Sequence, residues 1–182
     1  MDQRLIKIRK LVQKKFNQEY WQYHMLPMIK RALQLAKFYK VDKEMVELAA
    51  LLHDIGRAKS GDKDNHHFIG ATMVEKILKK FKYDQKIIDE IKHCIESHRS
   101  LKGPEPKTLM AKIIANADAM AHFNVFPVLI YYRGKKYNFE ETIKWVRAKV
   151  ERNWLKKITL PKAKKLVEKK YLAIKLLLKD FN

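Results

Sequence analysis

Residues 45–56 of the chain read MVELAALLHDIG, and this stretch decides the fold. It opens as an apolar helical run that a single glutamate interrupts. Asp42 precedes the run and predicts its N-cap, because a carboxylate accepts hydrogen bonds from the first free backbone N–H groups of a helix. Gly56 follows the run and is typical of a helix end. The stretch therefore predicts an apolar helix that carries His53 and Asp54 at its C-terminal end.

Most of the remaining chain also has helical periodicity, with apolar residues three and four positions apart and Lys or Arg opposite them. Pro27 falls inside one such run and indicates either a kink or a helix start near Leu26. No segment alternates apolar and polar residues as a strand does, and five Gly and five Pro leave little room for a turn-rich β architecture. We predict an all-α fold, with helices within residues 19–40, 43–54, 66–81 and 84–97 and further ones beginning near Thr108, Asn138 and Pro161.

The length and composition favour a single globular domain. A chain of 182 residues can build one sizeable core but is short for two ordinary domains. The single cysteine, Cys94, cannot form an internal disulfide, which favours a reducing compartment. No apolar stretch reaches bilayer length, and the first residues lack the pattern of a signal peptide. We therefore expect a cytoplasmic protein with no membrane contact, and we leave its oligomeric state open.

The formal net charge of +20 predicts attraction to polyanions, such as nucleic acid or phosphorylated metabolites. A dedicated nucleic-acid surface usually gathers its basic residues on one face. Here the lysines are spread along every predicted helix, which favours a generally charged surface of the kind common in heat-adapted proteins. Nucleic acid stays a possible partner on this evidence.

His53 and Asp54 indicate a metal site. Ionisable groups seldom close an apolar run unless something pairs with them, because desolvating a carboxylate is costly. A divalent cation suits a neutral imidazole beside a carboxylate. Two further ligands have to come from other helices, and His24 and Asp118 are the candidates. Two histidines and two aspartates leave coordination positions for water and substrate, which favours Mn²⁺, Fe²⁺, Co²⁺, Ni²⁺ or Mg²⁺ over a structural zinc ion.

Three short segments carry a resemblance to a known family. Residues 49–56 (AALLHDIG), 65–71 (NHHFIGA) and 115–120 (ANADAM) are similar, in order, to motifs of the HD-domain superfamily of metal-dependent phosphohydrolases. The chain most resembles the small, mostly uncharacterised HD hydrolases. This resemblance implies an all-α HD-domain helical bundle at about residues 19–125, followed by a C-terminal helical extension at about 126–182.

The resemblance also implies the ligands. His24, His53, Asp54 and Asp118 would hold a first metal ion, and Asp54 would bridge to a second one. His67 and His98 would bind that second ion, so that one or two ions per chain are both consistent with the sequence. The choice between His67 and His66 is open, because neighbours on a helix point apart and only one of them can face the metal. We expect the other to face solvent or a substrate phosphate.

Catalytic roles follow from this ligand set. Asp54 would orient or deprotonate a metal-bound water, and His66 and Arg57 would contact the substrate phosphate. Lys59 and Arg99 also follow ligand-bearing segments and are weaker candidates for that contact. His122 lies four residues after Asp118 and therefore on its face, which indicates a pocket wall or an outer-shell residue.

Two departures from the family pattern bear on the site. The late motif often has a carboxylate two positions before its metal aspartate, and this chain has Asn116 there, which predicts weaker outer-shell support. His98 is followed by Arg99-Ser100, so the signature of the cyclic-dinucleotide phosphodiesterases is missing. The resemblance therefore favours another branch of the superfamily.

These observations support one principal hypothesis and two alternatives. The principal one is a metal-dependent phosphohydrolase that cleaves a phosphomonoester, phosphodiester or phosphoanhydride, most plausibly in a nucleotide. The first alternative is an HD-fold protein that binds nucleic acid or processes RNA ends, with its Lys-rich C-terminal region holding the strand. The second is oxygenase chemistry at a di-iron site, which some HD-fold proteins perform.

Overall fold

The computed structural model describes residues 2–58, 65–99 and 103–181. These residues form helices and connecting turns and contain no strand, which confirms the all-α prediction. The elements are α1 (Gln3–Gln13), α2 (Gln18–Tyr20), η1 (Trp21–Met25), α3 (Leu26–Tyr39), α4 (Lys43–Leu52), η2 (Ile55–Ala58), α5 (His66–Lys80), α6 (Gln85–Ser97), α7 (Leu109–Asn124), α8 (Phe126–Gly134), α9 (Phe139–Arg152), η3 (Asn153–Lys157) and α10 (Pro161–Leu177).

The helix boundaries follow local signals in the sequence. Three side chains accept a hydrogen bond from the backbone N–H three residues later, at the starts of α4, α7 and α9 respectively: Asp42, Thr108 and Asn138. Pro161 is the first residue of α10, where its missing N–H costs no hydrogen bond. Pro27 lies inside a continuous helical stretch of residues 18–39, because Met25 before α3 is itself helical and α-helical geometry only resumes at Leu26, after the π-turn η1.

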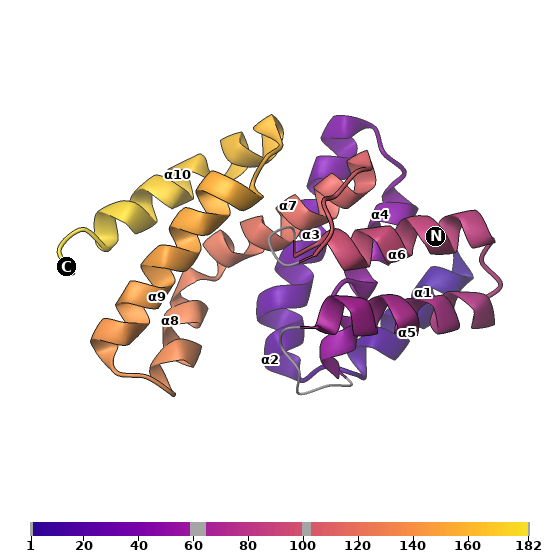
Figure 1. Ribbon diagram of the computed structural model, residues 1–182, viewed down its shortest axis with the longest axis horizontal. Coiled ribbons are helices and arrows are strands. Elements are labelled where there is room, and N and C mark those ends of the chain that lie inside the picture. Colours follow the sequence, from indigo (N-terminus) through magenta and orange to yellow (C-terminus); the bar gives the residue numbers. More distant parts are fainter. Residues whose placement is uncertain (1, 59–64, 100–102, 182) are drawn as a thin grey trace.

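Helix α7 is the centre of the core. Its residues are buried on almost every side, and α3, α4, α6 and α10 all pack against it. Figure 1 shows α1 to α6 on one side of the molecule and α8 to α10 on the other, with α7 running between the two groups. Segments that are far apart in the sequence therefore meet along α7.

Two short π-helical turns interrupt the α-helical geometry. The first, η1, precedes α3 and contains His24, and the second, η3, follows α9 and ends at Lys157. A π-turn holds one extra residue, so it rotates the side chains that follow relative to a regular α-helix. Helical periodicity in the sequence does not predict where these turns fall.

No single helix among the described residues has the length and apolar character needed to cross a bilayer. The bent pair Leu109–Asn124 and Phe126–Gly134 passes that test only when its two helices are taken together, and its first helix is the buried centre of the core.

Candidate metal centre

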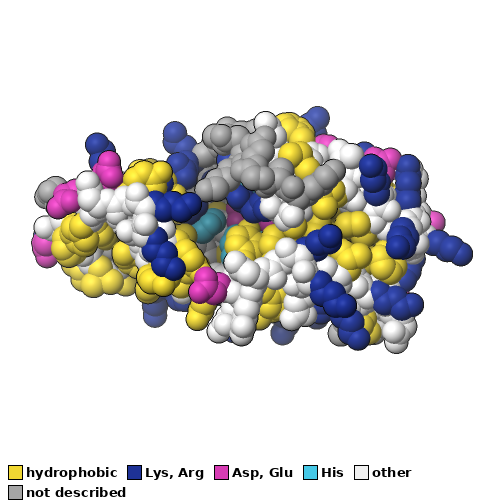
Figure 2. Space-filling view, turned by 90° about the horizontal axis from the view of Figure 1, so that it is seen from below, with side chains coloured by type: hydrophobic (Ala, Val, Ile, Leu, Met, Phe, Trp, Pro, Cys, Tyr) yellow, Lys and Arg dark blue, Asp and Glu magenta, His cyan; other side chains and the backbone are white. Residues whose placement is uncertain are grey.

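Six side chains from five segments meet beside α7. They come from η1, the end of α4, the first residue of α5, the end of α6 and the middle of α7, and they are His24, His53, Asp54, His66, His98 and Asp118. Figure 2 shows histidine side chains at the bottom of a recess in the surface, with Lys and Arg side chains beside them. The tertiary structure thus brings together residues that are separated by up to 94 positions in the chain (118 minus 24).

Asp54 lies at the centre of this group, and its two carboxylate oxygens face different histidines. Oδ2 lies 3.2 Å from Nε2 of His24 and 3.3 Å from Nε2 of His53. Oδ1 lies 3.0 Å from Nε2 of His66 and 3.5 Å from Nε2 of His98. The arrangement therefore contains two histidine pairs that share one buried carboxylate.

The orientation of two imidazoles is fixed by backbone carbonyls. Nδ1 of His53 lies 2.8 Å from the carbonyl oxygen of Ala50, and Nδ1 of His98 lies 2.6 Å from that of Ile95. A carbonyl only accepts, so each Nδ1 carries the proton and each Nε2 presents a lone pair toward Asp54.

The donor atoms fit a divalent cation. Nε2 of His24 and Nε2 of His53 are 3.1 Å apart, and Nε2 of His66 and Nε2 of His98 are 3.3 Å apart. Imidazole nitrogens together with carboxylate oxygens suit the transition metals of this size and charge. A metal ion placed between such atoms would accept the lone pairs that His53 and His98 present.

Asp118, on α7, lies beside the pair formed by His24 and His53. One of its oxygens lies 3.7 Å from Nε2 of His24, and Nζ of Lys157 lies 3.7 Å from the other oxygen. His122, one turn further along α7, completes a third group of potential ligands with His24 and Asp118. Burial opposes ionisation of Asp118, but the charges of Lys157 and the nearby histidines hold its pKa well below the usual range.

Two further neighbours contact the carboxylate of Asp54. Nε of Arg57 lies 2.8 Å from Oδ1, and the hydroxyl of Tyr20 donates a hydrogen bond to Oδ2. Burial by itself would raise the pKa of Asp54, but the facing histidines hold it well below the usual range. Burial raises the pKa of Tyr20 and the Asp54 charge raises it further, so the phenol keeps its proton and stays a donor.

Close backbone packing at Gly56 positions the first turn of α5. A Cβ atom at Gly56 would lie 2.0 Å from the carbonyl oxygen of His66 and 2.7 Å from the backbone nitrogen of Gly70. Only glycine allows this approach, which brings the start of α5 against η2 directly after Asp54. His66 is therefore held close to Asp54 by backbone contact.

The sequence left the choice between His66 and His67 open, and the two side chains have different neighbours in the structure. His66, and not His67, lies with Asp54 and His98. The ring of His67 is also buried, but it packs on Phe68 at 4.2 Å between ring centroids and is not part of any potential ligand group among the described residues. The first turn of α5 turns the two side chains in different directions, and sequence alone did not indicate which one faces inward.

Of the residues expected to contact phosphate, Arg57 is engaged by Asp54 and points into the centre. Arg99 lies just after α6, next to His98. Lys59 falls outside the described residues.

Three residues that lie in or near the centre were not predicted from the sequence. Tyr20 lies four positions before His24, a spacing that places both on one helix face and could have indicated it. Lys149 and Lys157 reach the centre from the C-terminal extension, and no motif marks them.

Asn116 ties the extension to α7, a role that a carboxylate could not fill. Its Oδ1 accepts hydrogen bonds from the backbone nitrogens of Thr159 and Leu160, at 2.9 and 3.0 Å. Its Nδ2 donates to the carbonyl of Lys112 at 2.8 Å and to Oγ1 of Thr159 at 3.2 Å. A carboxylate has no N–H to donate, so it could not make the two hydrogen bonds that Nδ2 donates. The asparagine that replaces the family's carboxylate therefore serves to hold the extension against α7.

The part of the chain that contains this centre is similar in sequence to known proteins. The family model of the HD domain matches residues 21–122. Ribonuclease Y of Mycoplasma mycoides subsp. mycoides is 34% identical over 120 residues, which cover 64% of this chain and 22% of the ribonuclease. The chain thus spans less than a quarter of this curated relative.

Two solved structures share the fold over nearly the whole chain. Bacillus subtilis YpgQ, solved in complex with ADP, superimposes with a TM-score of 0.75 at 22% identity, covering 97% of this chain and 94% of YpgQ. A predicted HD superfamily hydrolase from an uncultured Thermotogales bacterium gives a TM-score of 0.66 at 23% identity, covering 97% and 90% of the two chains. The family match spans more than half of the chain and includes all six converging residues. The protein belongs to the HD-domain family.

Proposed function

We propose that the protein is a metal-dependent phosphohydrolase that acts on a nucleotide. The observation that carries the proposal is the position of Asp54, whose two oxygens each face a pair of imidazole nitrogens. HD domains bind divalent metals, and the donor set of this chain fits such ions.

We assign the ligands from the contacts of each oxygen. His24, His53, Asp54 and Asp118 would hold one ion, and Asp54, His66 and His98 would hold another. Mn²⁺, Fe²⁺, Co²⁺, Ni²⁺ and Mg²⁺ remain the candidates. When bound, such an ion lowers the pKa of a coordinated water and withdraws charge from a phosphoryl oxygen.

The protein groups around the ligands would orient Asp54 and the substrate. Tyr20 and Arg57 fix the carboxylate of Asp54, so that its free lone pairs keep one direction. Arg57 stays protonated beside this carboxylate and offers its remaining N–H groups to a phosphate oxygen. His66, proposed here as a ligand, leaves the phosphate contact to Arg57 and other cations.

A nucleotide is the substrate class with most support. The structural neighbour YpgQ was solved with ADP bound, and Lys and Arg side chains lie beside the recess of this chain. Metal-assisted hydrolysis of a phosphate bond also needs cations near the leaving group, which the C-terminal extension contains.

The test compares Asp54→Asn with wild type. The substitution removes the charge and one acceptor oxygen at nearly constant volume. Purified proteins would be analysed for bound metal by mass spectrometry and assayed on mono-, di-, tri- and cyclic nucleotides with each candidate ion. Asp89→Asn serves as a matched control, because Asp89 is an exposed carboxylate of α6 that accepts a hydrogen bond from the side chain of Gln85.

We expect Asp54→Asn to lose metal and hydrolysis, and Asp89→Asn to keep both. Wild-type protein that takes up none of these ions, or that hydrolyses phosphate esters equally well after Asp54→Asn, would refute the proposal.

A second candidate function is action on RNA. Ribonuclease Y is among the curated relatives, and α8 presents exposed tyrosines next to basic side chains. Nζ of Lys135 lies 4.2 Å from the ring centroid of Tyr131, and the guanidinium of Arg133 lies 3.3 Å from that of Tyr137. Aromatic rings beside cations are typical of surfaces on which single-stranded bases stack. Titration of a labelled RNA oligonucleotide at rising salt would test this, with Tyr131→Ala expected to weaken binding.

A further inference from the structure

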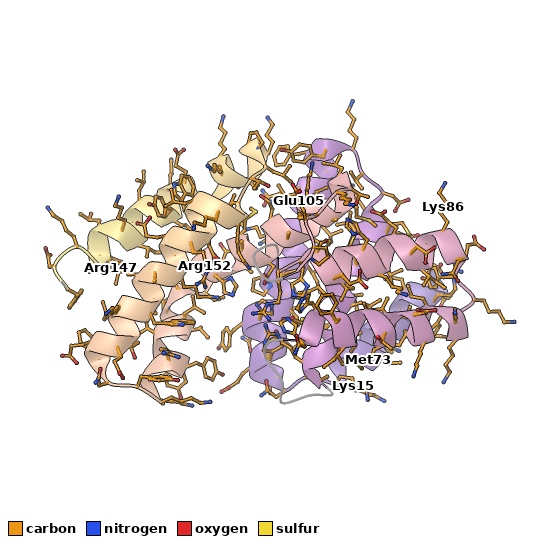
Figure 3. The ribbon with its side chains drawn as sticks, viewed as in Figure 1. Lys15, Met73, Lys86, Glu105, Arg147 and Arg152 are labelled. Carbon is orange, nitrogen blue, oxygen red and sulfur yellow. The ribbon has the colours of Figure 1, made fainter. Side chains whose placement is uncertain are left out.

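Two lysines of the C-terminal extension lie at the edge of the candidate metal centre. Lys157 ends η3, its side chain is only 14% exposed, and its Nζ lies 3.7 Å from Asp118. Lys149 lies on α9, two turns before Lys157, and its charge acts on both Asp118 and His122. Figure 3 shows Arg152, between these two lysines in the sequence, nearer to α7 than Arg147.

The extension is anchored so that these lysines face α7. Asn153, which is buried at the start of η3, lies with its Nδ2 3.5 Å from the carbonyl of Ala119 and 3.4 Å from Nδ1 of His122. Asn116 holds the other end through the backbone of Thr159 and Leu160. Buried amides on both sides of Lys157 therefore fix the position of the π-turn that carries it.

Burial disfavours the charged form of Lys149. Burial lowers the pKa of Lys149 to about 8, and no carboxylate lies within ion-pair distance of its Nζ among the described residues. The centroid of the Trp145 ring lies 5.5 Å from the Nζ of Lys149. Lys157 has one long ion pair, with Asp118, and that carboxylate is itself a proposed metal ligand. Lys149 is thus a partly buried cation without a carboxylate partner, and Lys157 shares its only carboxylate with the proposed metal site, a condition that an anionic ligand would relieve.

We propose that Lys149 and Lys157 form an anion-binding wall that holds a phosphate group adjacent to the one attacked at the metal centre. The wall favours substrates with two linked phosphates, such as nucleoside di- and triphosphates, over monophosphates. The proposal rests on the proposed phosphohydrolase function and assigns the substrate preference of that site to the C-terminal extension.

The direct test measures binding without turnover. Metal-loaded protein would be titrated calorimetrically with methylenediphosphonate, a diphosphate analogue whose bridging carbon resists hydrolysis, and separately with inorganic phosphate. The variants are Lys149→Met, Lys157→Met and the double variant, since methionine keeps much of the apolar stem. Lys156→Met is the matched control, because Lys156 lies in the same π-turn but is exposed. Metal content and thermal stability would be measured for every variant.

We expect each single substitution to weaken methylenediphosphonate binding about tenfold while phosphate binding changes about twofold or less, as removal of one charge-assisted contact to the outer phosphate requires. Lys156→Met should bind both ligands as wild type does. A double variant with an unchanged ratio of the two affinities would overturn the inference.

The two proposals fail in different ways. If Asp54-dependent hydrolysis is present but the lysine variants weaken both ligands equally, the phosphohydrolase function stands and the wall does not. If Asp54→Asn leaves activity and metal content unchanged, the function itself fails, whatever the lysine variants do.

Discussion

Replacement of Asn116 by alanine should destabilise the protein far more than loss of one side-chain amide normally does. The substitution removes four hydrogen bonds, two to backbone nitrogens of the extension and two donated by Nδ2. A net contribution of about 0.5–1.5 kcal/mol for each, with the buried N–H of Leu160 left unpaired, gives a loss of about 3 kcal/mol in the free energy of unfolding. For a chain of this length, that corresponds to a fall in Tm of about 6–12 °C.

Urea unfolding followed by circular dichroism measures the free energy directly. Asn138→Ala is the matched control, because Asn138 caps α9 through a single 2.9 Å hydrogen bond to the backbone nitrogen of Glu141. Loss of that cap should cost about 1 kcal/mol. Since Asn116 also anchors the segment that ends η3, Asn116→Ala should weaken methylenediphosphonate binding in the folded protein, whereas Asn138→Ala should not. Equal destabilisation by the two alanine substitutions would refute the reasoning that Asn116 ties the extension to the core.

Three further predictions concern the centre and its surroundings. His66→Ala should lower the metal-to-protein ratio measured by mass spectrometry, whereas His67→Ala should leave it unchanged; the reverse result would restore the assignment of His67. Gly56→Ala should destabilise the protein by about 1–3 kcal/mol in urea unfolding, because its Cβ would meet a carbonyl oxygen at 2.0 Å, while Gly134→Ala, with open space around it, should be neutral or slightly stabilising. Lys149→Met should be more stable than wild type below pH 8, by about 1–3 kcal/mol, because burial depresses the pKa of Lys149 to about 8. Between pH 8 and the usual lysine value of 10.5 the unfolded chain binds more protons at this site than the native one, so wild-type stability rises and the difference should shrink; a constant difference across this range would contradict the burial of the Lys149 charge.

The position of the candidate centre was predictable because its signals are local. The apolar run before His53 predicted an inward-facing helix end, and the order of the motifs placed the candidate ligands His24 and Asp118 on separate helices. Capping residues such as Asp42 and Thr108 act through hydrogen bonds within three residues, so their effect is readable in the sequence.

The sequence did not indicate in this way which histidine of α5 lies beside Asp54, or that Lys157 lies beside Asp118. Whether His66 or His67 faces Asp54 depends on how closely η2 approaches the start of α5, which Gly56 permits through contact with backbone atoms of another segment. Lys157 reaches Asp118 because a π-turn and two buried asparagines orient it, and neither leaves a periodic signature.

The amino-acid sequence by itself determined the all-α class, most helix starts and the family of the chain. These features depend on helical periodicity, on capping residues and on three short motifs in a fixed order. Only the tertiary structure showed that His66 lies beside Asp54 and that Lys157 of the C-terminal extension lies beside Asp118. Those features depend on contacts between residues such as Asn116 and Leu160, 44 positions apart, whose hydrogen bonds exist only after the core has brought their helices together.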